Sequence, residues 1–81
     1  MTATVVRSVA RASNLLHLLA ANRGYMPLGE IAHAANLPKS TAHGLLQTLV
    51  SENLVEHDPA CGSYRLSPSF ALGLGHRKDT R

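Results

Sequence analysis

The spacing of apolar residues changes once along this chain, near Asn53, and that change limits the folds open to it. Before Asn53, apolar residues recur every three or four positions, which is the period of amphipathic helices. After Asn53 they lie in short runs with the period of strands. A chain of 81 residues has room for one modest core. The sequence therefore predicts one mainly helical domain with a small β-hairpin.

Three helical segments precede Asn53. The first extends from Val5 to Ala21, and Gly24 follows it as a residue that can close a helix in the left-handed conformation. The second covers residues 28–35, and the third runs from Pro38, which we place at its first helical position, to Glu52. The apolar stripes expected to form the core are Val5, Val9, Ala12, Leu16 and Leu19, widened by Leu15 and Leu18; Leu28, Ile31, Ala32 and Ala35; and Ala42, Leu45, Leu46, Leu49 and Val50. The alternative for part of the first stripe is pairing with a second subunit, because that stripe can exceed what a small core covers.

The strand-like runs predict a hairpin that pairs residues 54–57 with residues 63–66 across a turn-rich loop. Two strands alone are only marginally stable, so the hairpin must pack on the helices. The side chains expected to face inward are Leu54, Tyr64 and Leu66. Residues 25–27 predict a stub of strand, and Ser67 and Pro68 predict the start of a short helix over residues 70–75, with the serine as its cap.

The order helix, short helix, tight turn, helix and hairpin is typical of a winged helix-turn-helix, whose third helix can enter the major groove of DNA. The formal net charge is +3 and the sequence pI is about 9.6, which permits an anionic partner without establishing one. A single cysteine, Cys61, favours a reducing compartment, and we expect a cytoplasmic protein. No apolar run approaches the length of a membrane span, and no signal peptide is visible.

The third helix offers a polar stripe without carboxylates opposite its apolar one. We predict that Ser40, His43 and Gln47 contact bases, because these side chains can reach base edges and glutamine can bond adenine through both its amide atoms. Lys39 and Thr41 lie at the start of the helix, where free N–H groups favour a phosphate. Plain capping of the helix end is an equally good interpretation of Ser40 and Thr41.

Further DNA contacts are predicted outside that stripe. Arg11, with Arg7 one turn before it, is expected to hold the phosphate backbone, and Arg65 in the hairpin is expected to contact phosphate. Solvated positions are the alternative for all three arginines. Possible additional contacts are Gly44, Thr48 and Ser63.

Four segments in order resemble the DNA-binding domain of the IclR family of bacterial transcriptional regulators. They are residues 6–12, residues 28–32, residues 37–49 with the sequence LPKSTAHGLLQTL, and residues 62–66 with the sequence GSYRL. The resemblance implies a winged helix-turn-helix over residues 1–67, the start of a linker helix and a disordered tail over 68–81, and an effector-binding domain absent from this sequence. It also implies a homodimer, a palindromic double-stranded operator and a regulator that is a repressor, with any small-molecule effector acting through the absent domain.

Two positions depart from that resemblance. Gly44 stands where the family usually has an arginine, so a major DNA contact is missing or is made by Lys39, Gln47 or Arg65 instead. Ser67 and Pro68 stand where a glycine is common after the Tyr-Arg-Leu run.

Other functions are less well supported by the residues. A winged-helix module that binds proteins without DNA remains an alternative, favoured by Gly44 and the low net charge. A small metal sensor is a second alternative, although the histidines and Cys61 lack the spacing of a zinc site. No nucleophile elbow or phosphate-binding loop is present, so we expect neither an enzyme nor a cofactor.

Overall fold

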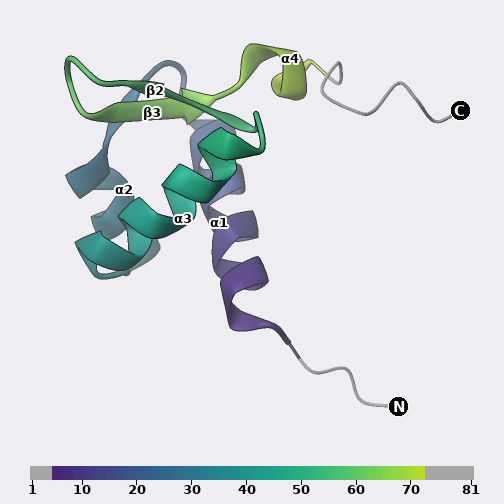
Figure 1. Ribbon diagram of the computed structural model, residues 1–81, viewed down its shortest axis with the longest axis vertical. Helices are drawn as coiled ribbons and strands as arrows, with labels where there is room; N and C mark the ends of the chain where they lie inside the picture. The colour runs from purple at the N-terminus through teal and green to yellow at the C-terminus, as the bar shows by residue number, and fades with distance from the viewer. Residues whose placement is uncertain (1–4, 73–81) are drawn as a thin grey trace, which may run out of the picture.

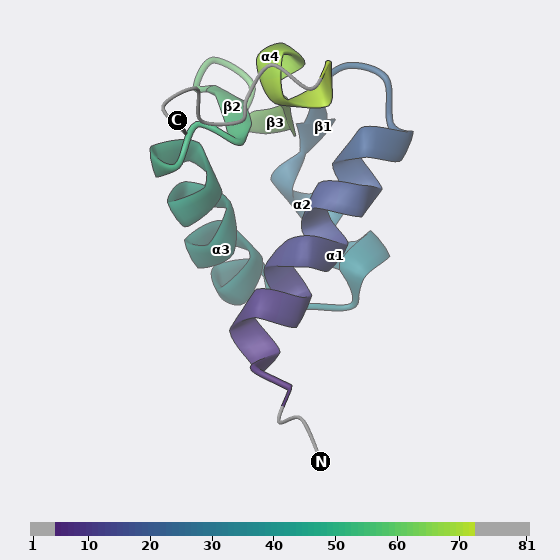
Figure 2. The same ribbon diagram turned by 90° about the vertical axis from the view of Figure 1, so that its right-hand side faces the viewer.

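Three helices lie beneath a small sheet in the computed structural model, which describes residues 5–72 (Figure 1). The elements in chain order are α1 (Arg7–Ala21), β1 (Met26–Pro27), α2 (Leu28–Ala35), α3 (Lys39–Ser51), β2 (Val55–Asp58), β3 (Ser63–Leu66) and α4 (Pro68–Ala71). The sheet and α4 lie at one end of the helices, and the N-terminal half of α1 projects from the other end (Figure 2). The predicted winged helix-turn-helix architecture is confirmed.

Helix α1 begins two residues later than predicted and is only half covered. Val6 is its extended N-terminal flanking residue, so Val5 and Val6 precede the helix. Leu15 and Leu19 are buried, as expected, but Val5 is 75% exposed and Val9 is 65% exposed. The prediction that these two valines join the core is wrong, because this end of α1 projects beyond the elements that cover its other half (Figure 2).

Helix α2 has the predicted bounds, and a left-handed residue ends it. Asn36 has φ 57°, and the backbone N–H of Leu37 donates to the carbonyl of Ala32 at 2.9 Å. Pro38 is then extended, with ψ 146°, and its carbonyl accepts the first helical hydrogen bond of α3 from Ala42. Pro38 is therefore the N-cap of α3 rather than its first residue, because the turn needs one extended residue before the helix begins.

The sheet has three antiparallel strands in the order β1-β3-β2. Met26 pairs with Tyr64 in β3, so the predicted stub of strand is a true edge strand. Strand β2 starts one residue later than predicted, since Asn53 is left-handed and the N–H of Leu54 still donates to the carbonyl of Leu49. Strand β3 contacts α1 and strand β2 contacts α3, so both strands of the hairpin pack on the helices.

The core lies where the sheet meets the three helices. Tyr64 is 2% exposed, which confirms its predicted inward orientation, whereas Leu54 and Leu66 are half-buried at the edge of the core. Val55, which the sequence did not single out, is 2% exposed and contributes to the core. The buried cluster is Leu15, Leu19, Ile31, Leu46, Leu49, Val55 and Tyr64.

The short helix α4 starts at Pro68, two residues before the predicted position. Ser67 is its N-cap residue, but its side chain makes no capping hydrogen bond and is largely buried. Residues 73–75 of the predicted helix, and the predicted disordered tail, lie outside the described residues. No helix within residues 5–72 is long and apolar enough to span a membrane.

Candidate nucleic-acid interface

Helix α3 presents one face to the core and the opposite face to solvent. Ala42 and Leu46 are fully buried and Leu49 is 5% exposed, so the inner face is fixed by packing on the other helices and the sheet. The outer face carries no carboxylate, and all its side chains are exposed or half-buried. These residues are Ser40, His43, Gly44, Gln47 and Ser51.

The first turn of α3 has no acidic residue, and no side chain caps it. Its free N–H groups and the positive end of the helix dipole therefore favour an anion. Lys39 and Ser40 are exposed here, and Thr41 is half-buried. The Lys39 stem lies near Gly29 of α2, because a Cβ on that glycine would be 3.8 Å from Lys39 Cε. Lys39 thus places a positive charge beside the free N–H groups of this turn.

Two side chains of the outer face contact each other and the wing. Gln47 Nε2 lies 3.4 Å from His43 Nε2, one turn earlier on the helix. The same nitrogen donates to the hydroxyl of Tyr64 in β3 at 3.5 Å. The wing and the outer face of α3 therefore meet at Gln47.

Other polar groups of α3 are used within the helix. The Thr48 hydroxyl donates to the carbonyl of Gly44 at 3.1 Å, and the Ser51 hydroxyl donates to the carbonyl of Thr48 at 2.7 Å. A Cβ on Gly44 would have no neighbour within 4 Å, so packing does not require a glycine there.

In the wing, Arg65 is paired. Its Nε and one terminal nitrogen donate to Glu56 Oε1 at 2.9 and 2.7 Å, and its guanidinium lies over the Tyr25 ring at 4.8 Å. The hydrogen bonds to Glu56 raise the pKa of Arg65 above its ordinary value, so the guanidinium stays charged. Any phosphate contact by Arg65 therefore competes with Glu56.

Ser63 does not reach the surface as the sequence suggested. Its side chain is 5% exposed, and its hydroxyl donates to the carbonyl of Cys61 at 3.4 Å. The prediction of a Ser63 contact assumed an outward side chain, but Ser63 and its neighbour Tyr64 are both buried. Ser63 is therefore removed from the set of candidate side-chain contacts.

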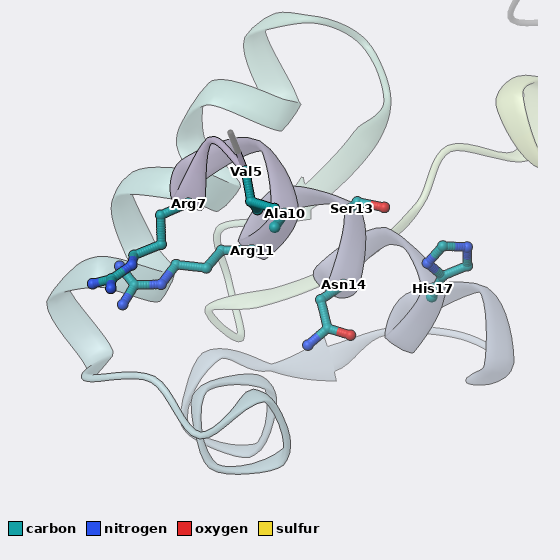
Figure 3. A pocket seen from close by; sticks show the side chains of 7 residues that line it. All are labelled: Val5, Arg7, Ala10, Arg11, Ser13, Asn14 and His17. Carbon is teal, nitrogen blue, oxygen red and sulfur yellow. The ribbon is translucent and has the colours of Figure 1, made fainter. Parts of the chain in front are cut away.

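The projecting end of α1 carries a shallow hollow of about 660 Å³. Arg7 and Arg11 extend to the same side of the helix there (Figure 3). Neither is in an ion pair, since Arg65 with Glu56 is the single pair among residues 5–72. The residues lining the hollow are Val5, Arg7, Ala10, Arg11, Ser13, Asn14 and His17.

The histidines and the cysteine are not gathered into a metal site in the part of the chain that the structure describes. No three side chains of histidine, cysteine, aspartate or glutamate lie close enough there to share an ion. His57 instead stacks on the Tyr64 ring, with centroids 4.5 Å apart, and Cys61 is exposed in the hairpin loop.

Comparison with known proteins identifies the family of this chain. The IclR helix-turn-helix domain matches residues 8–59, which is more than half of the chain. The chain belongs to the IclR helix-turn-helix family. The resemblance noted in the sequence is thereby confirmed.

Relatives within the family are transcriptional regulators. The chain is 41% identical over 71 residues to the glycerol operon regulatory protein of Streptomyces griseus, covering 88% of this chain and 28% of that protein. It is also 41% identical over 71 residues to the DNA-binding transcriptional repressor YiaJ of Escherichia coli, covering 88% of this chain and 25% of that protein. The chain thus spans about a quarter of the length of these relatives.

Solved structures of the family share the fold. A crystal structure of an IclR transcriptional regulator from Alicyclobacillus acidocaldarius superposes with a TM-score of 0.74 at 36% identity, covering 83% of this chain and 27% of that one. The structure of Pseudomonas aeruginosa HmgR gives the same TM-score at 25% identity, covering 84% of this chain and 29% of that one.

Two contacts of this candidate interface were missed by reasoning from the sequence. The Arg65–Glu56 pair follows from the hairpin register, since Glu56 and Arg65 are direct partners on β2 and β3. The correct register would have predicted it. The contact between Tyr64 and Gln47 has no such signal, because it joins a strand to a helix across 17 positions.

Proposed function

We propose that this chain binds double-stranded DNA in a sequence-specific way as the DNA-binding part of an IclR-type transcriptional regulator. The observation that carries the proposal is the solvent-facing, carboxylate-free face of α3. An α-helix fits the major groove, where each base pair has a distinct pattern of donors and acceptors. DNA phosphates would repel a face with acidic residues, and this face has none.

The residues divide into those that position the domain and those that read bases. Ser40, His43 and Gln47 are proposed to contact base edges, with Gly44 and Thr48 beside them. Phosphate contacts are assigned to Lys39, Thr41, Arg11 and Arg65. Arg11 is in no ion pair within residues 5–72, whereas Arg65 is paired with Glu56. The phosphate contact is therefore better supported for Arg11 than for Arg65.

A homodimer on a palindromic operator is the assembly we propose. Three exposed valines at the projecting end of α1 form an apolar surface of the kind that a second copy would bury. They are Val5, Val6 and Val9. Two-fold symmetry of the protein would then match two-fold symmetry of the operator.

The relatives suggest the regulatory role of the whole protein. YiaJ is named a repressor, and the Streptomyces proteins are named regulators of a glycerol operon. We propose that this chain also acts in the cytoplasm as part of a repressor, without catalysis. A small-molecule effector would act through a separate effector-binding domain outside these 81 residues.

Binding measured across a salt series tests the proposal. The probes are a duplex selected by the protein from a random-sequence library and a scrambled duplex of the same composition. Tighter binding to the selected duplex is expected, and Gln47→Ala should lose about 1–3 kcal/mol of the discrimination between them. Ser69→Ala, an exposed position on α4 and outside α3, is the matched control.

Two outcomes would contradict the proposal. Equal losses on both duplexes for Gln47→Ala would remove the base-reading role of Gln47. Absence of any binding at low salt and high micromolar protein would favour a protein-binding winged helix instead, because non-specific DNA binding alone has dissociation constants of about 10⁻⁴–10⁻⁶ M.

A further inference from the structure

The amide nitrogen of Gln47 already contacts two side chains in the free protein. Its nitrogen lies 3.4 Å from His43 Nε2 and donates to the Tyr64 hydroxyl at 3.5 Å. An amide nitrogen has two hydrogens: one is donated to the Tyr64 hydroxyl, and the other can be donated to His43 Nε2 when that nitrogen carries no proton. His43 accepts at Nε2 when its ring proton is on Nδ1. No hydrogen bond within residues 5–72 uses the Gln47 carbonyl oxygen.

Tyr64 is a rigid anchor for that nitrogen. Its side chain is 2% exposed and lies in the central strand of the sheet. The ring stacks on His57 from β2, with an interplanar angle of 16°. A buried tyrosine hydroxyl needs a hydrogen-bond partner, and Gln47 supplies one. Moving the Gln47 nitrogen toward DNA would therefore leave a buried hydroxyl without that partner.

Space beside Gln47 favours the approach of a base. Gly44, one turn earlier on α3, has no side chain, and a Cβ added there would meet nothing within 4 Å. The surface of α3 beside Gln47 is therefore open on that side, which leaves room for a base edge. The carbonyl oxygen is the amide atom left free for it.

Resting on the proposed function, we propose that Tyr64 is a positioning residue that makes Gln47 read DNA through its carbonyl oxygen alone. A carbonyl oxygen accepts only, so it selects a base with an amine in the major groove, which is N6 of adenine or N4 of cytosine. It rejects guanine and thymine, which present acceptors at the corresponding positions. The usual two-point contact of glutamine with adenine also needs the amide nitrogen at N7, and here that nitrogen is held by His43 and Tyr64.

Base analogues in the selected duplex test which amide atom is used. The position that Gln47 reads is the one where Gln47→Ala loses its base preference. If that base is adenine, purine removes the amine and 7-deazaadenine removes N7; if it is cytosine, 2-pyrimidinone removes the amine. We expect loss of the amine to weaken binding about tenfold. We expect loss of N7 to change binding less than about twofold.

The same duplexes bound to Gln47→Ala serve as the control, because any effect of an analogue on the DNA itself persists when the side chain is removed. A loss from 7-deazaadenine as large as the loss from purine would overturn the proposal. A preference for guanine or thymine that depends on Gln47 would overturn it as well. If the wild-type chain binds no duplex, or if Gln47→Ala alters no base preference, it is the proposed function that fails.

Tyr64→Phe tests the positioning role directly. It keeps the ring and its stacking on His57 but frees one hydrogen of the Gln47 amide. At an adenine, 7-deazaadenine should then weaken binding several-fold; at a cytosine, the preference over thymine should fall several-fold. Tyr25→Phe is the matched control, because Tyr25 is exposed and lies beside Arg65. Identical base preferences in the wild type and in a folded Tyr64→Phe would overturn the positioning role. The analogue measurements on the wild type stand whether or not that variant folds.

Discussion

The two faces of α3 differ in what they contact: one packs in the core and the other faces solvent. The inner face is buried against α1, α2 and the sheet, and its side chains are those of an ordinary core. The outer face is turned to solvent, and within residues 5–72 its side-chain hydrogen bond to another element is that of Gln47 with Tyr64. One helix therefore largely separates folding from recognition, and Gln47 is the outer-face residue that also contacts a side chain of the core.

Leu46→Ala should have the largest effect on stability, because it removes a buried side chain from the inner face. Leu46 is fully buried, and truncating such a leucine leaves a cavity that costs about 2–5 kcal/mol of unfolding free energy. Urea denaturation followed by circular dichroism measures it. Leu72→Ala is the control, since Leu72 is 73% exposed and should change stability by less than about 0.5 kcal/mol. Similar losses in both variants would contradict the division between faces.

Gly44→Ala should stabilise the protein, in contrast to substitutions on the inner face. A glycine inside a helix costs about 1 kcal/mol relative to alanine, and the new Cβ has open space around it. The free energy of unfolding should rise by that amount. Gly62→Ala is the control and should destabilise the hairpin, because Gly62 has φ +63°. A destabilised Gly44→Ala would show that the outer face packs against something.

Lys39→Ala tests the charged end of the outer face. Removing one phosphate contact should flatten the dependence of log affinity on log salt by about one unit, while stability stays unchanged. Arg23→Ala, an exposed position beyond the end of α1, should leave the slope as it is. An unchanged slope for Lys39→Ala would mean that Lys39 does not contact a DNA phosphate.

Glu56→Gln should produce the smallest effect, and in the direction of tighter binding. It removes the carboxylate that holds Arg65 and so frees that guanidinium for a phosphate. The pair is more than a third exposed and screened by solvent, so its loss should change stability little. Affinity for DNA at low salt should rise about two- to fivefold. Glu52→Gln, at the end of α3, controls for the loss of a negative charge alone; equal gains in both variants would mean that Arg65 is not involved.

Local chemistry explains which parts of the fold were predictable. The bounds of α2 and the polar face of α3 follow from apolar spacing, because a helix repeats every 3.6 residues whatever surrounds it. Pro38 is the N-cap and not the predicted first helical residue, and apolar spacing does not distinguish the two because both positions tolerate a proline. Val5 and Val9 continue the apolar stripe of α1, but no other element covers that end of the helix in the part of the chain that the structure describes.

The sequence by itself determined the order of the elements, the family and the carboxylate-free outer face of α3. These depend on residues close together in the chain. Only the tertiary structure decided that Glu56 holds Arg65, that Ser63 is buried, and that Tyr64 contacts the Gln47 nitrogen. Those contacts join different elements, and their geometry depends on how the sheet packs on α3. Which atom of the Gln47 amide is free to contact DNA therefore depends on the fold and not on the α3 sequence alone.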